Sequence, residues 1–313
     1  MTNLLELVTQ PNPELFFKRN DANDVRLGEI IPNETYENAE IIILGCPQDE
    51  GVSRNKGRLG ANLAPDKIRE QFYKLSNFGI KKKIHDLGNT IISNTLEETH
   101  ETQTKIVEQI LRDGKRLIIL GGGNDISFAD GLAMANVFNE NWIAINIDQH
   151  FDVRADEIRN SGTPYRQLLD GKFLKGENFY EVAYQTQANS PIYFDYLQKL
   201  GVNCLSIEQI RSNESVDEQL RESLKLKFIR QTSTLNTFFG FDMDAVRSSD
   251  APGTSAPSPI GLRAGEFITL VKLAASLSNT KIIEFTEVNP NYDIDNRTTK
   301  LVAIAMHRFC SAK

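Results

Sequence analysis

Two short groups of residues in this chain have the side chains and the spacing to bind a metal ion. The first group places Asp148, His150 and Asp152 at alternate positions, and the second places Asp242 and Asp244 in the same way. Carboxylates that converge in a buried place repel one another and lose hydration unless cations compensate their charge. Carboxylate oxygens together with an imidazole suit Mn²⁺ or a similar divalent ion, although Ni²⁺ and Fe²⁺ can share such ligands. The sequence therefore predicts a metal centre and leaves the identity of its ion open.

Each group follows a short apolar run, which spans 142–147 before the first group and 238–241 before the second. Such runs are typical of buried parallel strands, and open α/β sheets bind their ligands at the carboxyl ends of these strands. Because strand side chains alternate between two faces, we expect Asp148, His150 and Asp152 to point the same way. An Asp-x-Asp pair after a strand can instead be a helix N-cap followed by a solvated turn residue. Two such groups, each after a buried strand, favour the metal centre over that alternative.

Segments typical of strands alternate with segments typical of helices along most of the chain. The expected strands are 41–44, 84–87, 116–120, 142–147, 179–184, 202–205, 238–241 and 281–287. The expected helices include 65–75, 97–112, 125–138, 263–277 and 298–308. This alternation predicts an α/β fold with a doubly wound, mainly parallel sheet flanked by helices. We expect one domain over 39–313, with the polar residues 1–38 forming an N-terminal extension on its surface or on a neighbouring subunit.

Length and composition limit the classes of protein to which this chain can belong. The chain has 313 residues, a mass of 35.2 kDa, 40% hydrophobic residues and 3 cysteines. No apolar run approaches the roughly 20 residues of a membrane span, and the first residues lack the basic and apolar regions of a secretory signal. A net charge of -7 argues against nucleic acid as a partner. Because few, scattered cysteines do not make a disulfide framework, we expect a cytoplasmic protein that binds neither membranes nor nucleic acids.

Further blocks of sequence resemble, in order, the motifs of the ureohydrolase family, which includes arginase, agmatinase and formimidoylglutamase. They read Gly-Gly-Gly-Asn-Asp, Asp-Gln-His-Phe-Asp, Ser-Gly-Thr-Pro-Tyr-Arg, Phe-Asp-Met-Asp and Glu-Val-Asn-Pro. With two opening loops, the blocks occupy 45–52, 55–61, 121–125, 148–152, 161–166, 241–244 and 287–290. Two details resemble the formimidoylglutamase branch. Ser161 stands where arginases and agmatinases typically carry a histidine, and Ser-Ala-Pro occupies 255–257 where arginases have Gly-Thr-Pro.

The resemblance implies an arginase-like three-layer fold and a pair of Mn²⁺ ions that share a hydroxide. The ligands that it implies are Asp148 and Asp242 for both ions, Asp152 and Asn124 for the first, and His150 and Asp244 for the second. Neighbouring cations lower the pKa of water between them, which produces a nucleophile without a strong protein base. The remaining histidines, His85, His100 and His307, match no metal spacing and are expected at the surface or in ordinary packing.

Asn124 departs from the family pattern, because the family usually has a histidine at this position. An amide oxygen is a weaker ligand for Mn²⁺ than an imidazole, so the first metal site is expected to be weak or empty. Alternatively, Asn124 only caps the helix that follows it. The sequence thus leaves open an asymmetric or single metal centre and a homologue with altered chemistry.

The resemblance implies hydrolysis of a C–N bond in a linear amidine or guanidine by a metal-bound hydroxide. The favoured reaction converts N-formimidoyl-L-glutamate to L-glutamate and formamide. The alternatives are another guanidino substrate, such as agmatine, arginine or guanidinobutyrate, and a catalytically weak metal-binding homologue. The resemblance also implies a homo-oligomer, a trimer or a hexamer.

Two catalytic residues are implied by the same resemblance. Asp152 would bond the hydroxide and pass a proton to the leaving amine, and Glu287 would hold the cationic nitrogens of the substrate. Ser161, Arg166 and Asn189 are candidate substrate-binding residues. Arg166 could instead form an ordinary surface ion pair.

Overall fold

The computed structural model describes residues 4–211 and 235–312, which build one nine-stranded sheet. The strands are β1 (Val8–Thr9), β2 (Ile41–Gly45), β3 (Ile84–Thr90), β4 (Arg116–Leu120), β5 (Trp142–Ile147), β6 (Phe179–Tyr184), β7 (Asn203–Ser206), β8 (Asn236–Asp242) and β9 (Thr280–Thr286). Their spatial order is β1-β3-β2-β4-β9-β8-β5-β6-β7. β1 pairs antiparallel with β3, and each other neighbouring pair is parallel.

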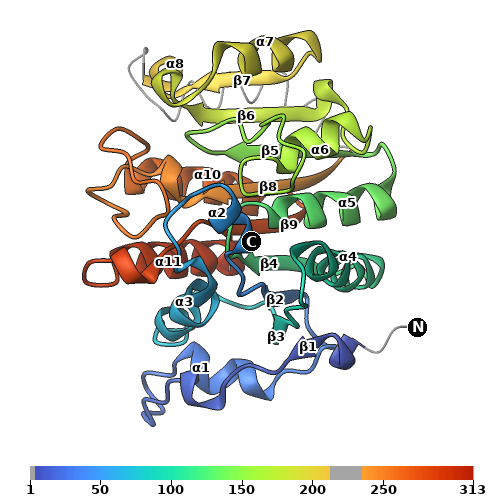
Figure 1. The fold of residues 1–313 in the computed structure, drawn as a ribbon. Helices are drawn as coiled ribbons and strands as arrows, with labels where there is room; N and C mark the ends of the chain where they lie inside the picture. Colours follow the sequence, from blue (N-terminus) through green and yellow to red (C-terminus); the bar gives the residue numbers. More distant parts are fainter. Residues whose placement is uncertain (1–3, 212–234, 313) are drawn as a thin grey trace.

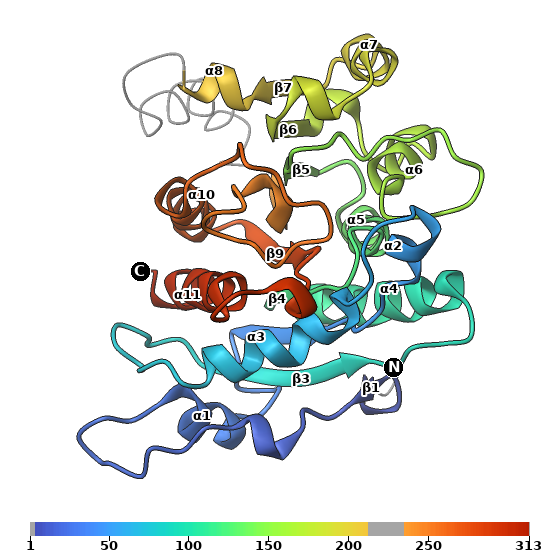
Figure 2. The ribbon, with the colours of Figure 1, turned by 60° about the vertical axis from the view of Figure 1, so that its left-hand side comes forward.

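Helices cover both faces of this sheet (Figures 1 and 2). They are α1 (Leu27–Ile30), α2 (Glu50–Arg54), α3 (Ala64–Phe72), α4 (Leu96–Arg112), α5 (Ile126–Phe138), α6 (Pro164–Asp170), α7 (Pro191–Lys199), α8 (Ile207–Arg211), α10 (Ala264–Ser276) and α11 (Arg297–Ser311). α3, α10 and α11 pack together on one face, and α4, α5 and α6 pack on the other. The predicted doubly wound α/β fold is confirmed.

The strands read as unbroken apolar runs because both of their faces are buried. In β2, Ile41 and Ile43 belong to the hydrophobic core beneath α3, α10 and α11. Their neighbours Ile42 and Leu44 belong to the core beneath α4, α5 and α6. Alternating side chains thus fill two cores, as expected for a parallel sheet covered by helices on both sides.

The N-terminal extension is part of this architecture. β1 adds an antiparallel strand to the edge of the sheet beside β3. Leu27 and Ile31 are buried in the core that also contains residues of α3. The described part of the extension therefore closes one edge of the sheet. None of the helices in the described ranges combines the length and the apolarity that a membrane span needs.

The expected strands and helices agree with the structure to within a few residues. Near the predicted site, the structure also has two helices that the sequence did not predict. α2 and α6 are short helices in segments that the sequence indicated as loops. The expected helix 65–75 ends at Phe72. The ladder of parallel strands, with its connections returning over both faces, brings distant loops to one edge.

Candidate metal centre

The candidate ligands lie at the carboxyl ends of four strands that are neighbours in the sheet. The order of these strands is β4, β9, β8 and β5. Asn124 follows β4, Glu287 follows β9, Asp242 ends β8 and Asp148 follows β5. Segments that are far apart in the sequence therefore meet at one place, which is where open α/β sheets bind their ligands.

Two groups of side chains at this edge could each hold a metal ion. Asp148, His150 and Asp244 form one group, and the ligand atoms of this group lie within 4.8 Å of one another. Asp148, Asp152 and Asp242 form the other group under the same limit. Asp148 belongs to both groups, whereas Asp242 belongs only to the second. The structure thus brings together the five acidic and histidine residues that the sequence singled out.

These residues do not converge by the alternation of strand side chains, and that expectation was wrong. β5 ends at Ile147, so the first group lies on a loop, and the positive φ of Asp152, 48°, is incompatible with a strand. Local turns shape both segments instead. The Asp148 carboxylate accepts a hydrogen bond from the amide of His150 (2.7 Å), and that of Asp242 accepts one from the amide of Asp244 (2.9 Å).

The electrostatics of this cluster fit cations. Burial, followed by repulsion from neighbouring carboxylates, raises the pKa of Asp148 to about 6 and those of Asp152 and Asp242 well above the usual value. Burial acts to lower the pKa of His150, but Asp244 and Asp148 outweigh it and raise that pKa to about 12. The pKa of Asp244 is lowered because His150 outweighs the effect of burial. One Asp244 oxygen is buried without a hydrogen-bond partner among the described residues. One imidazolium beside three buried acids and the half-buried Asp152 leaves negative charge that divalent ions would compensate.

Asn124 faces the cluster with its amide nitrogen. Its Nδ2 donates to Asp152 Oδ2 at 2.6 Å, and its Oδ1 accepts from the hydroxyls of Ser127 and Thr286 at 2.9 Å each. The helix-cap alternative was wrong, because α5 begins at Ile126 and the side chain of Asn124 points at the carboxylates. To offer its oxygen to an ion, the amide must turn over. Both hydroxyls can then accept from Nδ2 instead of donating.

Glu287 lies beside Asn124 at the carboxyl end of β9. Its Oε1 accepts a hydrogen bond from the backbone amide of Asn124 at 2.8 Å. Burial is the main cause that raises the pKa of Glu287 to about 8. The residue has a φ of 60°, so the chain turns sharply as it leaves the strand. A buried carboxyl group next to the candidate metal ligands is well placed to meet a cationic substrate group.

Ser161 is held by contacts with α2. Its hydroxyl accepts from Asn55 Nδ2 at 3.0 Å, and its amide donates to the carbonyl of Gly51 at 3.1 Å. Ser161 is 7% exposed, so a small part of it remains accessible beside the ligand loop.

The other two substrate-binding candidates are engaged elsewhere. Arg166 donates to Asp170 at 2.6 Å and stacks over the ring of Tyr196, which is the ion-pair alternative to a substrate contact. Asn189 donates to the carbonyls of Gln149 and Gln185 and accepts from the amide of Phe151. Its amide therefore braces the loop that carries the ligands, a role that the sequence did not reveal.

Arg154 was missed by the sequence analysis. It follows Asp152 by two residues. Its exposed side chain packs against Gly162, the residue after Ser161. Its backbone amide donates to the carbonyl of Gly162 at 2.8 Å. Its position two residues after the predicted ligand Asp152 could have indicated a functional cation in the sequence.

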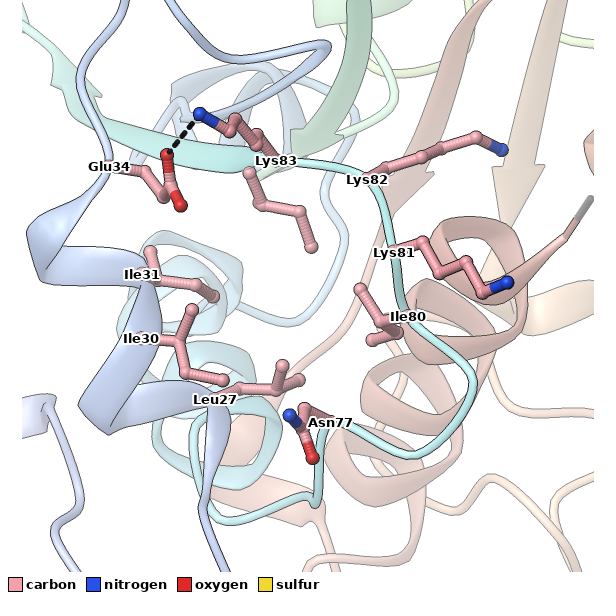
Figure 3. Close-up of a pocket in the computed structure, with 10 residues that line it drawn as sticks. Leu27, Ile30, Ile31, Glu34, Asn77, Ile80, Lys81, Lys82 and Lys83 are labelled. Carbon is pink, nitrogen blue, oxygen red and sulfur yellow. Dashed lines mark ion pairs between the residues drawn. The ribbon is translucent and has the colours of Figure 1, made fainter.

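Two pockets lie outside the carboxylate cluster. One, of about 190 Å³, adjoins the ligand loop on the side of α7 and is lined by Phe151, Tyr184, Thr186, Asn189, Ser190, Pro191 and Phe194. The other, of about 260 Å³, is lined by apolar residues that include Leu27, Ile31 and Ile80 (Figure 3). Ile84 also lines it. Ile84 begins β3, so the second pocket lies at the amino ends of the strands, opposite the cluster.

Comparisons with known proteins agree with this geometry. The model of the Arginase family matches residues 39–311. The formimidoylglutamase of Staphylococcus haemolyticus is 31% identical over 316 residues, which is 97% of this chain and 99% of that protein. The crystal structure of Trypanosoma cruzi formiminoglutamase with Mn²⁺ is 31% identical, with a TM-score of 0.84 over 92% of this chain and 98% of that one. The formimidoylglutamase structure from Bacillus subtilis is 26% identical, with a TM-score of 0.85 over 95% and 94% of the two chains. This chain belongs to the arginase family.

Proposed function

We propose that this chain is a Mn²⁺-dependent hydrolase that converts N-formimidoyl-L-glutamate and water into L-glutamate and formamide. The main observation that supports this proposal is the pair of ligand groups that share Asp148 at the carboxyl edge of the sheet. Supporting it, relatives named formimidoylglutamase resemble the chain over nearly its whole length. The reaction is the hydrolysis of a linear amidine C–N bond, the chemistry that the family resemblance implies.

The residues that would hold the ions are those of the two groups. Asp148, Asp152 and Asp242 would bind one ion, and Asp148, His150 and Asp244 would bind the other. When bound, Mn²⁺ ions supply the positive charge that makes water a nucleophile near neutral pH. Asn124 would join the first ion after its amide turns over.

Asp152 would transfer a proton near the reacting carbon, and Glu287 would pair with the positive charge of the substrate. Asp152, whose carboxyl group belongs to one of the two ligand groups, would pass a proton to the leaving amine. Glu287 would pair with the cationic formimidoyl nitrogens. That cation favours the ionised form of Glu287 and lowers its pKa from about 8.

Arg154 would bind a carboxylate of the substrate, together with contacts from Ser161. N-formimidoyl-L-glutamate carries carboxylates at the end away from its reacting group, and a planar guanidinium binds carboxylates with paired hydrogen bonds. The Arg154 side chain is exposed and lies over Gly162, next to Ser161. Arg166 is the weaker candidate for this role because its guanidinium is paired with Asp170.

The test is an assay of the Mn²⁺-loaded protein with N-formimidoyl-L-glutamate, L-arginine and agmatine. We expect L-glutamate and formamide from the first compound and no urea from the others. Asp242→Ala should lose activity and bind less Mn²⁺, because it removes a ligand of one group. Turnover of arginine or agmatine in place of the first compound would overturn the proposed substrate. No turnover of any of them would favour a catalytically weak homologue.

Arg154→Ala separates the proposed substrate contact from general effects. We expect its KM for N-formimidoyl-L-glutamate to rise by about tenfold or more, since a hydrogen-bonded charge pair is lost. Arg166→Ala is the matched control, and its KM should stay within about twofold because a surface ion pair contributes little. Equal effects of both substitutions would contradict the role of Arg154.

We also propose a cytoplasmic homo-oligomer, a trimer or a hexamer. Cys46, Cys204 and Cys310 are free thiols in the described chain, which agrees with a reducing compartment. The family resemblance supports the assembly. Light scattering that gave one species of 35.2 kDa, the mass of a single chain, would contradict it.

A further inference from the structure

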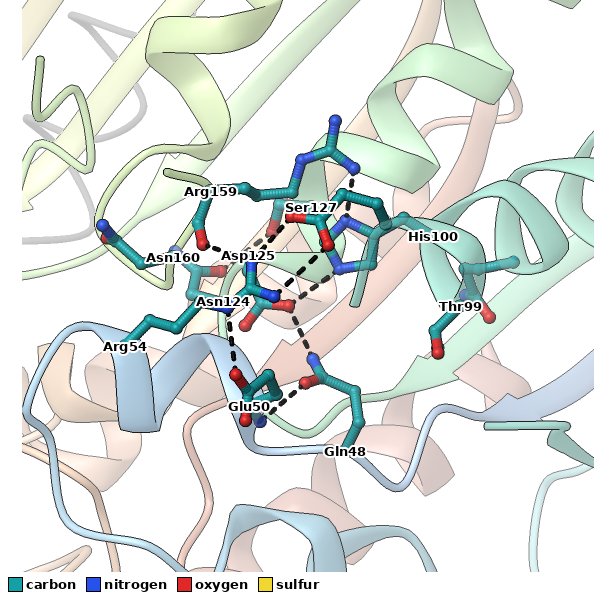
Figure 4. Close-up of polar contacts among 12 residues, drawn as sticks. Gln48, Glu50, Arg54, Thr99, His100, Asn124, Asp125, Ser127, Arg159 and Asn160 are labelled. Atoms are coloured by element: carbon teal, nitrogen blue, oxygen red, sulfur yellow. Dashed lines mark hydrogen bonds and ion pairs between the residues drawn. The ribbon is translucent and has the colours of Figure 1, made fainter. Parts of the chain in front are cut away.

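Behind the metal centre, one carboxylate oxygen joins segments from three parts of the chain (Figure 4). Asp125 Oδ2 accepts from Gln48 Nε2 at 2.6 Å and from His100 Nε2 at 2.8 Å. Gln48 lies in the loop after β2, His100 lies in α4, and Asp125 precedes α5. All are almost fully buried, and the exposed fraction of His100 is 1%. The expectation of a surface or ordinary packing role for His100 is therefore replaced by a specific polar one.

The hydrogen bonds of His100 fix its tautomer. Arg159 Nη1 lies at 3.0 Å from His100 Nδ1. A guanidinium can only donate, so Nδ1 accepts and the ring hydrogen is on Nε2, where it is donated to Asp125. Arg159 is itself fixed by stacking on Phe128 at 4.2 Å and by a bond to Gln167. The imidazole is therefore a directed link from Arg159 to Asp125.

Gln48 provides an equally directed link on the other side of Asp125. Its Oε1 accepts from the amide of Glu50 at 3.0 Å, so its Nε2 must be the end that faces Asp125. This bond positions the start of α2 against Asp125. A methyl group on Gly51 would overlap the Asp125 carboxylate, so the backbone of α2 approaches it as closely as glycine allows.

Both links end on the loop that contains Ser161. Gly51 of α2 and Asn55, the residue after this helix, bond to Ser161, and Arg54 of α2 donates to the carbonyl of Arg159 at 3.2 Å. The bonds form a closed ring that runs through Asp125, His100, Arg159, Asn160, Ser161, Gly51, Glu50 and Gln48. The residue before Asp125 is Asn124, which faces the metal cluster. The ring thus ties the substrate loop to the metal centre.

We propose that His100, as the Nε2–H tautomer, is a positioning residue that closes this ring and fixes Ser161 relative to the turn carrying Asn124. Removing its donor would release the loop and weaken substrate binding, while the carboxylate ligands keep their own local turns. This inference rests on the proposed function, because Ser161 is a proposed substrate contact.

A pair of substitutions tests the direction of the link. In His100→Gln the side-chain amide can take the place of Nε2 and still donate to Asp125, whereas in His100→Asn it can replace only Nδ1. We expect the KM of His100→Asn for N-formimidoyl-L-glutamate to rise by about tenfold, with little change in kcat, and that of His100→Gln to stay within about threefold. Mn²⁺ content should be unchanged in both. Equal KM values for the two variants would overturn the proposal.

Two further variants separate positioning from general stability. Gln48→Met breaks the other link to Asp125 and should raise KM like His100→Asn. His307→Asn is the matched control. His307 lies on α11, is half-buried and forms a hydrogen bond through Nε2 with the carbonyl of Ser76. We expect the KM of this variant to stay unchanged even where its melting temperature falls. A lower melting temperature with an unchanged KM in His100→Asn and Gln48→Met would show a merely structural role and contradict the proposal.

Hydrogen exchange measures the same link without turnover. The amide of Ser161, which donates to Gly51, should exchange faster in His100→Asn than in His100→Gln or the wild type. If the wild type does not hydrolyse the proposed substrate, the proposed function fails, and this measurement still decides the role of His100. Unchanged exchange at Ser161 in His100→Asn would overturn it.

Discussion

Asn124 shows how one residue can decide the strength of a metal site. Its amide nitrogen donates to Asp152, while its oxygen is held by the hydroxyls of Ser127 and Thr286. This orientation supplies a hydrogen-bond donor to the carboxylates, and it disfavours a cation because the NH₂ group, not the oxygen, faces the cluster. The position of Asn124 was predictable from the glycine block. Its orientation was not, because Thr286 lies 162 residues further along the chain.

Replacing Asn124 by histidine should tighten Mn²⁺ binding. An imidazole nitrogen is a stronger ligand than an amide oxygen and does not have to turn against two hydroxyls, so we expect affinity to rise by about an order of magnitude or more. Calorimetric titration of the two metal-free proteins with Mn²⁺ measures this change. Equal stoichiometry and affinity would mean that the side chain at this position does not reach the ions.

At the scale of elements, the strands were easier to predict than the loops that carry the ligands. The apolar runs of β4 and β6 are buried on both faces, so their bounds follow from composition alone. α2 and α6 are short and lie among glycine, proline and polar residues, and their positions depend on contacts that are distant in sequence. The ligand loop after β5 likewise takes its shape from Asn189, which comes from the segment after β6.

Asn189→Ala should loosen the ligand loop. The substitution removes bonds to Phe151, Gln149 and Gln185, so we expect a loss of about 1–3 kcal/mol in the free energy of unfolding and weaker Mn²⁺ binding. Denaturant unfolding and Mn²⁺ titration measure the two effects. Asn203→Ala is the control, because Asn203 also bonds backbone carbonyls, but at β7. It should lose stability and keep its Mn²⁺ affinity, and a similar loss of affinity in both variants would contradict the role of Asn189.

At the scale of the whole molecule, the site depends on strand order, which the sequence did not provide. β9 is the last strand in the chain, yet it lies between β4 and β8 and delivers Glu287 beside Asn124. Local patterns predict that a strand exists, but its neighbours are chosen by packing over the whole sheet. The resemblance to a family could predict the meeting of the ligand blocks, because their order along the chain is diagnostic. It could not show the buried polar groups beneath them.

Those buried groups lower the stability of the molecule, and Asp130 on α5 is the clearest case. It is fully buried, it accepts from Gln103 Nε2 at 2.9 Å, and its Oδ2 has no hydrogen-bond partner among the described residues. Burial raises the pKa of Asp130 to about 6, while the adjacent Glu284 is raised well above its usual value. The folded protein therefore binds a proton that the unfolded chain releases, and the free energy of unfolding should fall as pH rises from about 4 to 6.

Asp130→Asn should remove this pH-dependent loss. An asparagine can still accept from Gln103, and its amide can donate towards the unpartnered Oε1 of Glu284. Since each pKa unit corresponds to about 1.4 kcal/mol, we expect the variant to be more stable than the wild type by about 1–3 kcal/mol at pH 8. The difference should vanish below about pH 3, where Asp130 is protonated in both states of the wild type. Denaturant unfolding of the metal-free proteins across this range measures the difference, with the exposed Asp195→Asn as control. A difference that grew towards low pH would mean that Asp130 is stabilised as a carboxylate by its surroundings.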